Sequence, residues 1–292
     1  MPNRLRQVID SAATVLAEAG IDSARTDAEL LAAHLAGTER GRLAVIDLPD
    51  AGFFDRFQHA VQQRSQRIPL QHITGTAAFG PVRLQVGPGV FIPRPETESM
   101  LEWVLAQTLP DRPVIVDLCT GSGALAIALA AGRPDAEVIA VDDDPSALEY
   151  ARRNLELTGF STGVRLVQGD VTDPALLPEL AGCVDVLVAN PPYIPIGSEL
   201  EPEVAEHDPV HALFGGADGM AVITPIVTLA AAWLKAGGTA AVEHDDTTSD
   251  ATVETFSGAG VFREITAHRD LTERPRFVTA RRTGGDFRGG VG

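Results

Sequence analysis

Four apolar segments in the middle of the chain alternate with stretches of helical pattern. The segments are Val114–Leu118, Val138–Val141, Val164–Val167 and Val184–Ala189. Short apolar runs separated by helices are typical of parallel strands that are buried on both faces of a sheet. Helices are expected between them, notably at Ala124–Ala131 and Pro145–Leu157, and further strands at Gly238–Glu243, Phe262–Ala267 and Arg276–Arg281. The pattern therefore predicts an α/β domain with a parallel, doubly covered sheet.

The residues before this domain have a different pattern. Apolar residues at helical spacing predict three helices over about residues 4–19, 28–36 and 52–67, with Asp27 as the N-cap of the second helix. Alternation at Val82, Leu84 and Val86, between Gly-Pro turns, predicts a β-hairpin. The predicted boundaries are a helical domain at 1–75, a hairpin linker at 76–96, the α/β domain at 97–283 and a flexible tail at 284–292.

The composition restricts the classes of partner. The 292 residues include 23 Lys and Arg against 40 Asp and Glu, a net charge of −17, which weighs against direct binding of nucleic-acid phosphates. No apolar stretch approaches the roughly 18–20 residues of a membrane span, and the N-terminus has the pattern of an amphipathic helix and not of a signal peptide. Cys119 and Cys183 lie far apart, with neither metal-binding spacing nor a disulfide framework. We therefore expect a cytoplasmic protein without a membrane partner.

A glycine-containing loop follows the first of the four apolar segments. The run Cys119-Thr120-Gly121-Ser122-Gly123 joins a predicted strand to a predicted helix, so the backbone can turn sharply and approach a ligand closely. Asp142 ends the next strand, where a carboxylate can accept hydrogen bonds from ribose hydroxyls. This combination fits sites for NAD, FAD and S-adenosylmethionine (SAM) alike, and a turn that only packs the helix on the strand is the structural alternative.

Asp170 follows the third apolar segment in the same way. Its carboxylate could accept a hydrogen bond from an adenine amino group, or it could merely cap a turn. Asp143 and Asp144 are expected to face solvent or to cap the helix that begins at Pro145.

The fourth apolar segment runs directly into Asn190-Pro191-Pro192-Tyr193. The two prolines stiffen this turn, so the Asn190 side-chain oxygen and the Pro191 carbonyl can both accept from one planar NH2 group. Tyr193 offers a face on which an amide or a base can stack. Two fixed acceptors can pyramidalise such a nitrogen and direct its lone pair at a methyl donor, and no general base is compulsory. The turn thus predicts methylation of an amide or of an exocyclic amine.

Together with two further runs, these motifs resemble the PrmC/HemK family of glutamine N5-methyltransferases over almost the whole chain. The further runs are Pro69–Gly75 and Pro88–Glu98, and Gly215–Gly219 completes the set. The resemblance implies a seven-stranded SAM-dependent, Rossmann-like domain behind a small helical domain and a hairpin. It also implies methylation of the glutamine in the Gly-Gly-Gln motif of class I peptide-chain release factors, with S-adenosylhomocysteine as the product and no metal.

The resemblance also assigns roles to individual residues. It places the loop from Cys119 to Gly123 around the methionine part of SAM, with Asp142 at the ribose, and Asp170 and Val171 beside the adenine. The substrate glutamine is expected at Asn190, Pro191, Pro192 and Tyr193, with Asn190 also near the amino-acid part of SAM, and Phe91 in contact with the ligands. Arg94 and Glu96 border the site in the family's pattern, or they form an ion pair that pins the hairpin.

The sequence departs from the family pattern at several positions. Cys119 replaces the usual Gly, and Val171 stands where some members have an aromatic residue beside the adenine. His207-Asp208-Pro209 and Glu243-His244-Asp245 also differ from the usual runs. His207 and His244 lack the spacing of metal ligands.

Three other functions remain as alternatives. A methyltransferase that acts on an exocyclic amine of adenine or guanine in RNA or DNA would use the same turn, although the chain lacks a basic patch. An NAD-dependent oxidoreductase would not need the Asn-Pro-Pro-Tyr turn. A binding protein without activity would need neither Asn190 nor Tyr193 nor Asp142.

Overall fold

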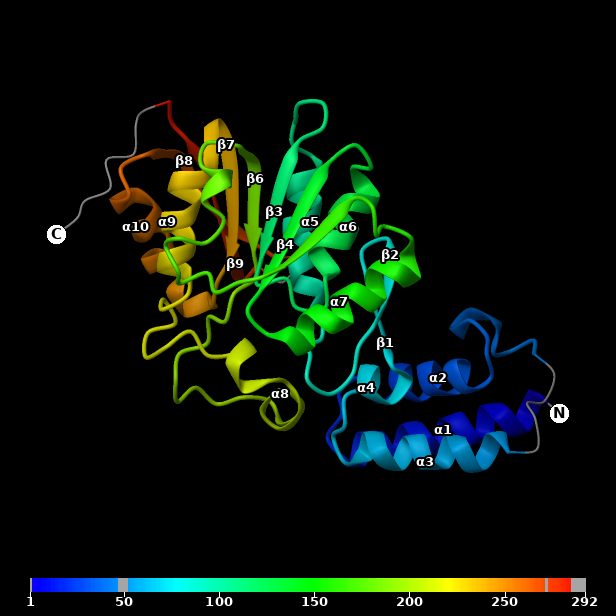
Figure 1. Ribbon diagram of the computed structural model, residues 1–292. Coiled ribbons are helices and arrows are strands. Elements are labelled where there is room, and N and C mark those ends of the chain that lie inside the picture. Colours follow the sequence, from blue (N-terminus) through cyan, green and yellow to red (C-terminus); the bar gives the residue numbers. More distant parts are fainter. Residues whose placement is uncertain (1, 47–51, 271–272, 285–292) are drawn as a thin grey trace. The chain divides into compact units, whose positions relative to one another are not determined.

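The computed structural model describes residues 2–46, 52–270 and 273–284, and the chain divides into two compact units. The helical unit comprises Met1–Thr76 and Leu200–His207, and the sheet unit comprises Ala77–Glu199 and Asp208–Gly292 (Figure 1). No helix in the described parts of the chain is long and apolar enough to cross a bilayer. The predicted tail lies outside the described residues from residue 285 onward.

The helical unit contains α1 (Pro2–Glu18), α2 (Ala24–Leu35), the 3-10 turn η1 (Arg40–Arg42), α3 (Phe53–Ser65), α4 (Leu70–Thr74) and α8 (Pro202–His207). In this unit, α1 to α4 share one apolar core, and α8 is held to them by ion pairs of Glu203 with Arg64 and Arg67. Leu16, Leu31 and Phe53 are fully buried in the core, and the rings of Phe53 and Phe57 stack at 5.7 Å. Apolar residues spaced three or four apart bring these side chains to one face of each helix.

Asp27 does not cap a helix, which corrects the prediction from sequence. Helix α2 begins at Ala24, so Asp27 lies in its first turn, where it is only 4% exposed. Its carboxylate accepts from Ser23 Oγ at 2.8 Å and pairs with Arg64 Nε of α3 at 2.7 Å. Because this partner lies 37 residues away, the local pattern could not reveal that the aspartate is buried in an ion pair.

The sheet unit contains seven strands in the order β5-β4-β3-β6-β7-β9-β8. The strands are β3 (Val114–Leu118), β4 (Glu137–Asp142), β5 (Val164–Gln168), β6 (Val184–Ala189), β7 (Leu234–Glu243), β8 (Phe262–Arg269) and β9 (Pro275–Arg282). The pairs from β5 to β7 are parallel, whereas β9 pairs antiparallel with both β7 and β8. The predicted seven-stranded fold class is confirmed, but the sheet is mixed and not purely parallel. The connection from Arg269 to Pro275 is too short for the crossover that a parallel pair needs.

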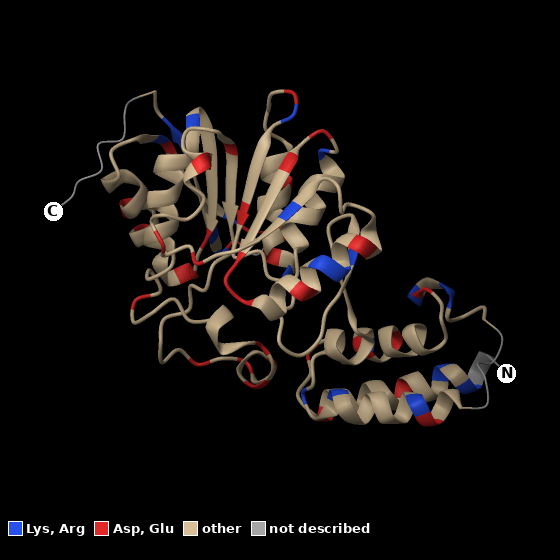
Figure 2. Cartoon of the chain, viewed as in Figure 1, with Lys and Arg blue, Asp and Glu red and all other residues tan. Residues whose placement is uncertain are grey.

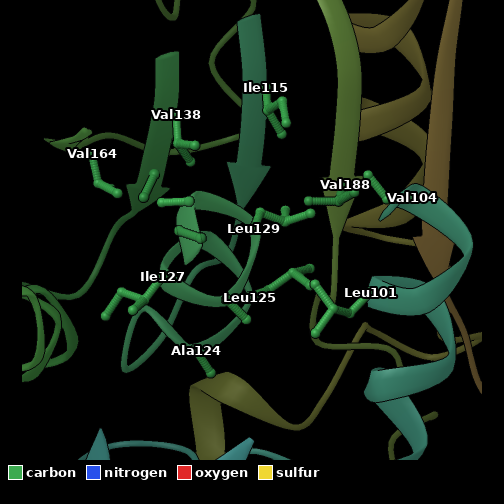
Figure 3. Close-up of a cluster of buried hydrophobic side chains, with 14 of the residues drawn as sticks. Leu101, Val104, Ile115, Ala124, Leu125, Ile127, Leu129, Val138, Val164 and Val188 are labelled. Atoms are coloured by element: carbon green, nitrogen blue, oxygen red, sulfur yellow. The ribbon is translucent and has the colours of Figure 1, made fainter. Parts of the chain in front are cut away.

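Helices cover both faces of this sheet. On one face lie α5 (Glu98–Leu105), α6 (Ala124–Gly132) and α7 (Pro145–Thr158), and on the other lie α9 (Ile223–Trp233) and α10 (Ser249–Gly258). Side chains alternate along β3, so Ile115 packs with Leu125 and Leu129 of α6 (Figure 3), while Val116 joins the cluster of the opposite face. Burial on both faces explains the continuous apolar runs in the sequence.

The predicted hairpin is present before the sheet, as β1 (Thr76–Phe79) and β2 (Val82–Gln85). The buried Asn154 of α7 accepts from the Gln85 N–H at 2.6 Å and donates to the Gln85 carbonyl at 3.0 Å. Its amide therefore pairs with both the N–H and the carbonyl of one residue of β2, as the backbone of a neighbouring strand would. Short 3-10 turns complete the unit at η2 (Pro95–Thr97), η3 (Pro178–Leu180), η4 (Val210–Ala212) and η5 (Asp246–Thr248).

Candidate active site

A cavity of about 310 Å³ opens at the carboxyl ends of the parallel strands in the sheet unit. Parallel strands end at the same edge of a sheet, so the segments that follow β3, β4, β5 and β6 converge there. Twelve predicted site residues line the cavity: Phe91, Cys119, Thr120, Gly121, Ser122, Asp142, Asp170, Val171, Asn190, Pro191, Pro192 and Tyr193. The remaining predicted residue, Gly123, is the N-cap of α6. Its role as a ligand contact stays a prediction, as do the roles of the other twelve.

The loop between β3 and α6 needs left-handed backbone conformations. Cys119, Gly121 and Gly123 have φ values of 58°, 57° and 80°. Glycine adopts this region without the steric cost that a Cβ atom imposes, which explains why glycine suits the position of Cys119. A Cβ atom on Gly121 would meet no other atom within 4 Å, so this position borders open space on the cavity side. The loop thus leaves room for a ligand against its backbone.

Asp142 closes the loop from the end of β4. Its Oδ2 accepts from the Gly121 N–H at 2.8 Å, and its Oδ1 accepts from the Asp144 N–H at 3.0 Å. Burial raises the pKa of this carboxyl to about 6, against the lowering effect of the two backbone donors, so it is ionised at neutral pH. Each oxygen keeps a lone pair with which it could accept from a ribose hydroxyl. Asp144 itself caps α7 by accepting from the Ser146 N–H at 2.8 Å, as predicted.

Asp170 caps a turn, which is one of the two interpretations drawn from the sequence, and its contact with adenine stays a prediction. Its Oδ1 accepts from the backbone N–H and the hydroxyl of Thr172, at 2.8 and 2.7 Å, which is the turn-capping arrangement. These hydrogen bonds also lower the pKa of Asp170, so the carboxylate is charged. Because the residue lines the cavity beside Val171, its second oxygen is left for a ligand amino group.

The turn after β6 is held on two sides by side chains from distant segments. Asn190 Nδ2 donates to Thr97 Oγ1 at 3.0 Å, and the Tyr193 hydroxyl donates to Glu243 Oε1 at 3.0 Å. The same Glu243 accepts from the Thr97 hydroxyl through Oε2 at 2.7 Å. Burial raises the pKa of Glu243 to about 7, and it also raises the pKa of the Tyr193 phenol, so Tyr193 stays protonated.

The glycine run 215–219 lies directly behind this turn. A Cβ atom on Gly215 would come within 2.6 Å of the Pro192 carbonyl oxygen, and one on Gly219 within 2.4 Å of the Tyr193 carbonyl oxygen. The Gly215 N–H donates to the Ile194 carbonyl at 3.0 Å. Only glycine permits so close a backbone approach, which gives a physical reason for this motif. The glycines therefore pack directly against the backbone of the turn.

The segment before α5 brings an aromatic ring and an arginine to the cavity. The Arg94 guanidinium lies over the Phe91 ring, 4.9 Å from its centroid, and both residues line the cavity. Arg94 forms an ion pair with the buried Asp208, so the ion pair recorded for Arg94 is not with Glu96. Asp208 belongs to the run that departs from the family pattern, and it holds Arg94 at the site.

The cavity is acidic. Five aspartates line it, namely Asp117, Asp142, Asp143, Asp144 and Asp170, and Arg94 and His211 are the basic residues in its lining. His211 Nε2 lies 3.2 Å from Asp144 Oδ2, so one of the two is already engaged by the acidic group. A concave site of one sign concentrates ligands of the opposite sign. The lining favours a ligand with positive charge, such as the sulfonium and ammonium groups of SAM.

Sequence reasoning missed three polar residues that line or anchor the site. Asp117 interrupts the apolar strand β3, and its Oδ2 accepts from the Thr120 hydroxyl at 2.6 Å and from the Ala126 N–H at 3.1 Å. Thr97 and Glu243 hold the Asn190 turn. The available signal was an acidic residue inside or at the end of an apolar strand, which Asp117 and Glu243 both show.

The two histidines in the departing runs lie in different places. His207 ends α8 of the helical unit, and His244 is buried just after β7, where Nδ1 lies 2.8 Å from the Asp245 carbonyl. Burial lowers the pKa of His244, so it is neutral at pH 7. Residues 2–46, 52–270 and 273–284 contain no cluster of three or more His, Cys, Asp or Glu side chains suited to a metal.

Comparison with known proteins gives a consistent result along the chain. Residues 7–75 match the model of the PrmC N-terminal domain, and residues 89–207 match that of the methyltransferase small domain. The release factor glutamine methyltransferase of Mycolicibacterium smegmatis is 63% identical over 96% of this chain and 98% of its own length. That of Corynebacterium glutamicum is 49% identical over 95% and 99%. A methyltransferase from Pyrococcus furiosus, 19% identical, shares the fold over 68% of this chain and 88% of its own, with a TM-score of 0.50. The chain belongs to the release factor glutamine methyltransferase family.

Proposed function

We propose that this protein transfers a methyl group from SAM to the side-chain amide nitrogen, N5, of the glutamine in the Gly-Gly-Gln motif of class I release factors. The observation that carries the proposal is that the Asn190–Tyr193 turn and the loop 119–123 line one cavity. A donor and an acceptor bound to these two segments would share that space. Family membership over nearly the whole chain supports the same reaction and the same partner.

The residues present fit SAM. The left-handed loop at Cys119 and Gly121 leaves room for the methionine part, Asp142 offers two acceptor oxygens to the ribose, and Asp170 offers one to the adenine amino group. The acidic lining complements the sulfonium and ammonium charges. When bound, SAM supplies an electrophilic methyl group on a positively charged sulfur. No metal is needed for this transfer.

The turn would prepare the glutamine amide as nucleophile. The amide nitrogen is a weak nucleophile because its lone pair is delocalised into the carbonyl group. If the two N–H groups donate to Asn190 Oδ1 and to the Pro191 carbonyl, the nitrogen is drawn out of the amide plane and its lone pair is aimed. Tyr193 would support the amide through its ring, because its hydroxyl is engaged by Glu243. The nitrogen becomes acidic as it is methylated and then releases its proton.

We further propose roles for the predicted parts of the chain. The helical domain at 1–75 would contact the release factor, the hairpin 76–96 would link it to the methyltransferase domain at 97–283, and neither would bind nucleic acid directly. The acidic excess on the chain (Figure 2) disfavours phosphate contacts. Cys119 and Cys183 are free thiols, which fits work in the reducing cytoplasm.

The test measures methyl transfer from labelled SAM to the purified cognate release factor. A matched copy of the factor, with its Gly-Gly-Gln glutamine changed to alanine, is the control. We expect label on the first and none on the second, because the amide is the acceptor. Label on total RNA or DNA, with none on either factor, would contradict the proposal in favour of a nucleobase amine. Equal label on both factors would place the methyl group on another side chain.

A further inference from the structure

Three chain segments meet at the Asn190 turn and form one continuous chain of hydrogen bonds. Asn190 follows β6, and Glu243 is the last residue of the neighbouring strand β7, where Ala189 pairs with Val242. Thr97 lies at the start of α5 and places its hydroxyl between them. The hydrogen bonds run from Asn190 Nδ2 to Thr97 Oγ1 and from there to Glu243 Oε2.

Above about pH 7, where Glu243 is ionised, the direction of these hydrogen bonds is fixed at their buried end. An ionised carboxylate can only accept, so the single proton of the Thr97 hydroxyl is used for Glu243. The Thr97 oxygen can then only accept from the Asn190 side chain, which requires the NH2 group of the amide on that side. The amide oxygen, Oδ1, is consequently left for the cavity that Asn190 lines.

The second oxygen of Glu243 acts on the other end of the turn. Oε1 accepts from the Tyr193 hydroxyl, so one carboxylate holds both the amide and the ring of the turn. Glu243 is 1% exposed and Thr97 is 4% exposed, and water therefore does not compete for these bonds. A hydrogen-bond network that is buried and fully paired is stiffer than its separate members.

We infer that Thr97 and Glu243 are positioning residues, which orient the Asn190 side chain so that its oxygen and not its nitrogen meets the amide of the substrate. An Asn190 side chain turned over would present NH2 to the NH2 group of the glutamine, and no acceptor would draw the substrate nitrogen out of its plane. The inference rests on the proposed function, because it assigns to the turn an acceptor role toward an amide.

The main test compares Thr97→Val with Thr97→Ser. Valine keeps the shape of threonine but removes the hydroxyl, whereas serine keeps the hydroxyl. Thr239→Val is the matched control, because Thr239 lies buried on β7 and its hydroxyl has no hydrogen-bond partner in the structure. Asn190→Ala removes the side-chain amide altogether, so its loss of kcat sets the upper limit for the loss that a wrongly oriented Asn190 amide could cause. Each variant is assayed at pH 8, where Glu243 is ionised, for kcat, for KM of the release factor, for SAM affinity and for Tm.

We expect Thr97→Val to lower kcat about tenfold or more, the scale of one lost hydrogen bond in the transition state. Its SAM affinity should stay within about twofold of the unmodified protein, whereas its Tm should fall below that of Thr97→Ser, because Glu243 and Asn190 each lose a hydrogen-bond partner at Thr97. Thr97→Ser should recover most of kcat, and Thr239→Val should leave kcat unchanged. Unchanged kcat in Thr97→Val would overturn the inference. So would a loss of kcat that is matched by an equal loss of SAM affinity, because that would mark a structural role.

Glu243→Gln provides a second, independent test of the hydrogen-bond network. Its amide can accept from one of the two hydroxyls but must donate to the other, so the direction of the chain is no longer fixed. We expect a lower kcat in the single variant and a loss in the Thr97→Val, Glu243→Gln pair that is smaller than the product of the two single losses. If the kcat loss of the double variant equals the product of the two single losses, Thr97 and Glu243 do not act together on the orientation of Asn190. If the unmodified protein does not methylate the factor at all, the proposed function fails and the inference that rests on it fails too, whereas an active protein with an unaffected Thr97→Val overturns the inference alone.

Discussion

Asp142 is the residue on which we expect the proposed SAM site to depend most. It is anchored by two backbone N–H groups, and burial holds its pKa at about 6, well above the usual value of an aspartate. Near that pH the carboxyl changes from a pure acceptor into a group that also carries a proton. The same burial that fixes its geometry therefore makes its charge sensitive to mild acid.

We expect SAM affinity to fall as the pH drops below about 6. The ionised Asp142 can accept from two ribose hydroxyls, whereas the protonated form cannot, so binding at pH 5 should be about tenfold weaker than at pH 8. Calorimetric titration of SAM across this range measures the effect. Asp142→Asn is the control, because it removes this titration and leaves those of SAM and of the other groups, such as Asp117. Parallel pH profiles in the two proteins would exclude Asp142 from the ribose site.

At the scale of elements, the hairpin packs on the helices through apolar side chains, and the side chain of Asn154 adds hydrogen bonds to it. Asn154 of α7 forms two hydrogen bonds to the backbone of β2 and donates to the Ser122 carbonyl of the cofactor loop at 2.9 Å. A two-stranded hairpin is marginal by itself. The Asn154 amide thus links the hairpin, α7 and the loop that follows β3.

Asn154→Ala should destabilise the sheet unit by about 2–4 kcal/mol. The substitution leaves the Gln85 N–H and two carbonyls without their partner. The bond to the Ser122 carbonyl is buried, and such a group costs about 1–3 kcal/mol when unpaired, whereas the two part-buried groups of Gln85 cost less because water reaches them. Urea unfolding monitored by circular dichroism gives the free energy. Arg153→Ala on the exposed side of the same helix should change it by less than about 0.5 kcal/mol. A similar small change in Asn154→Ala would show that water replaces the amide.

The elements could be predicted where the signal is local. Val114–Leu118 and Val184–Ala189 coincide with β3 and β6, because an apolar run bounded by polar residues marks a buried strand. The short helix α4 was missed inside the segment from residue 70 to 96, and the antiparallel place of β9 has no local signal. The glycine loop, Asp142 and the Asn190 turn were recognised from their motifs. Thr97 and Glu243 were not, because their hydrogen-bond partners lie 93 and 146 residues away.

At the scale of the whole molecule, three buried carboxyls have pKa values that burial raises. Burial raises the pKa of Asp117 to about 7, of Asp142 to about 6 and of Glu243 to about 7. In the unfolded chain these groups lose their protons near pH 4, so between pH 4 and 7 the folded state binds more protons than the unfolded state. Their contribution to stability is therefore present in acid and is lost as the pH rises through about 7. The net charge of −17 adds repulsion in the same direction.

We expect the Tm to be higher at pH 6.5 than at pH 8, by about 3 °C in a domain of this size. His244 and His268, whose pKa values burial lowers, act in the opposite sense and reduce this difference. Thermal unfolding in the two buffers without SAM measures the difference. Asp117→Asn should reduce it, because both recorded hydrogen bonds of Asp117 go to one oxygen, which asparagine retains. A Tm that rises toward pH 8 would contradict the assignment.

The helix α8 gives the helical unit a second, separate stretch of chain. Its Glu203 pairs with Arg64 at 2.8 Å and with Arg67 at 2.6 Å, so residues 200–207 belong with the first 76 residues. This stretch follows the Asn190 turn by only a few residues. A graft of the helical unit onto another methyltransferase scaffold would therefore require two spliced pieces of chain. A truncation at residue 76 would likewise leave an acidic helix behind without the arginines that neutralise it.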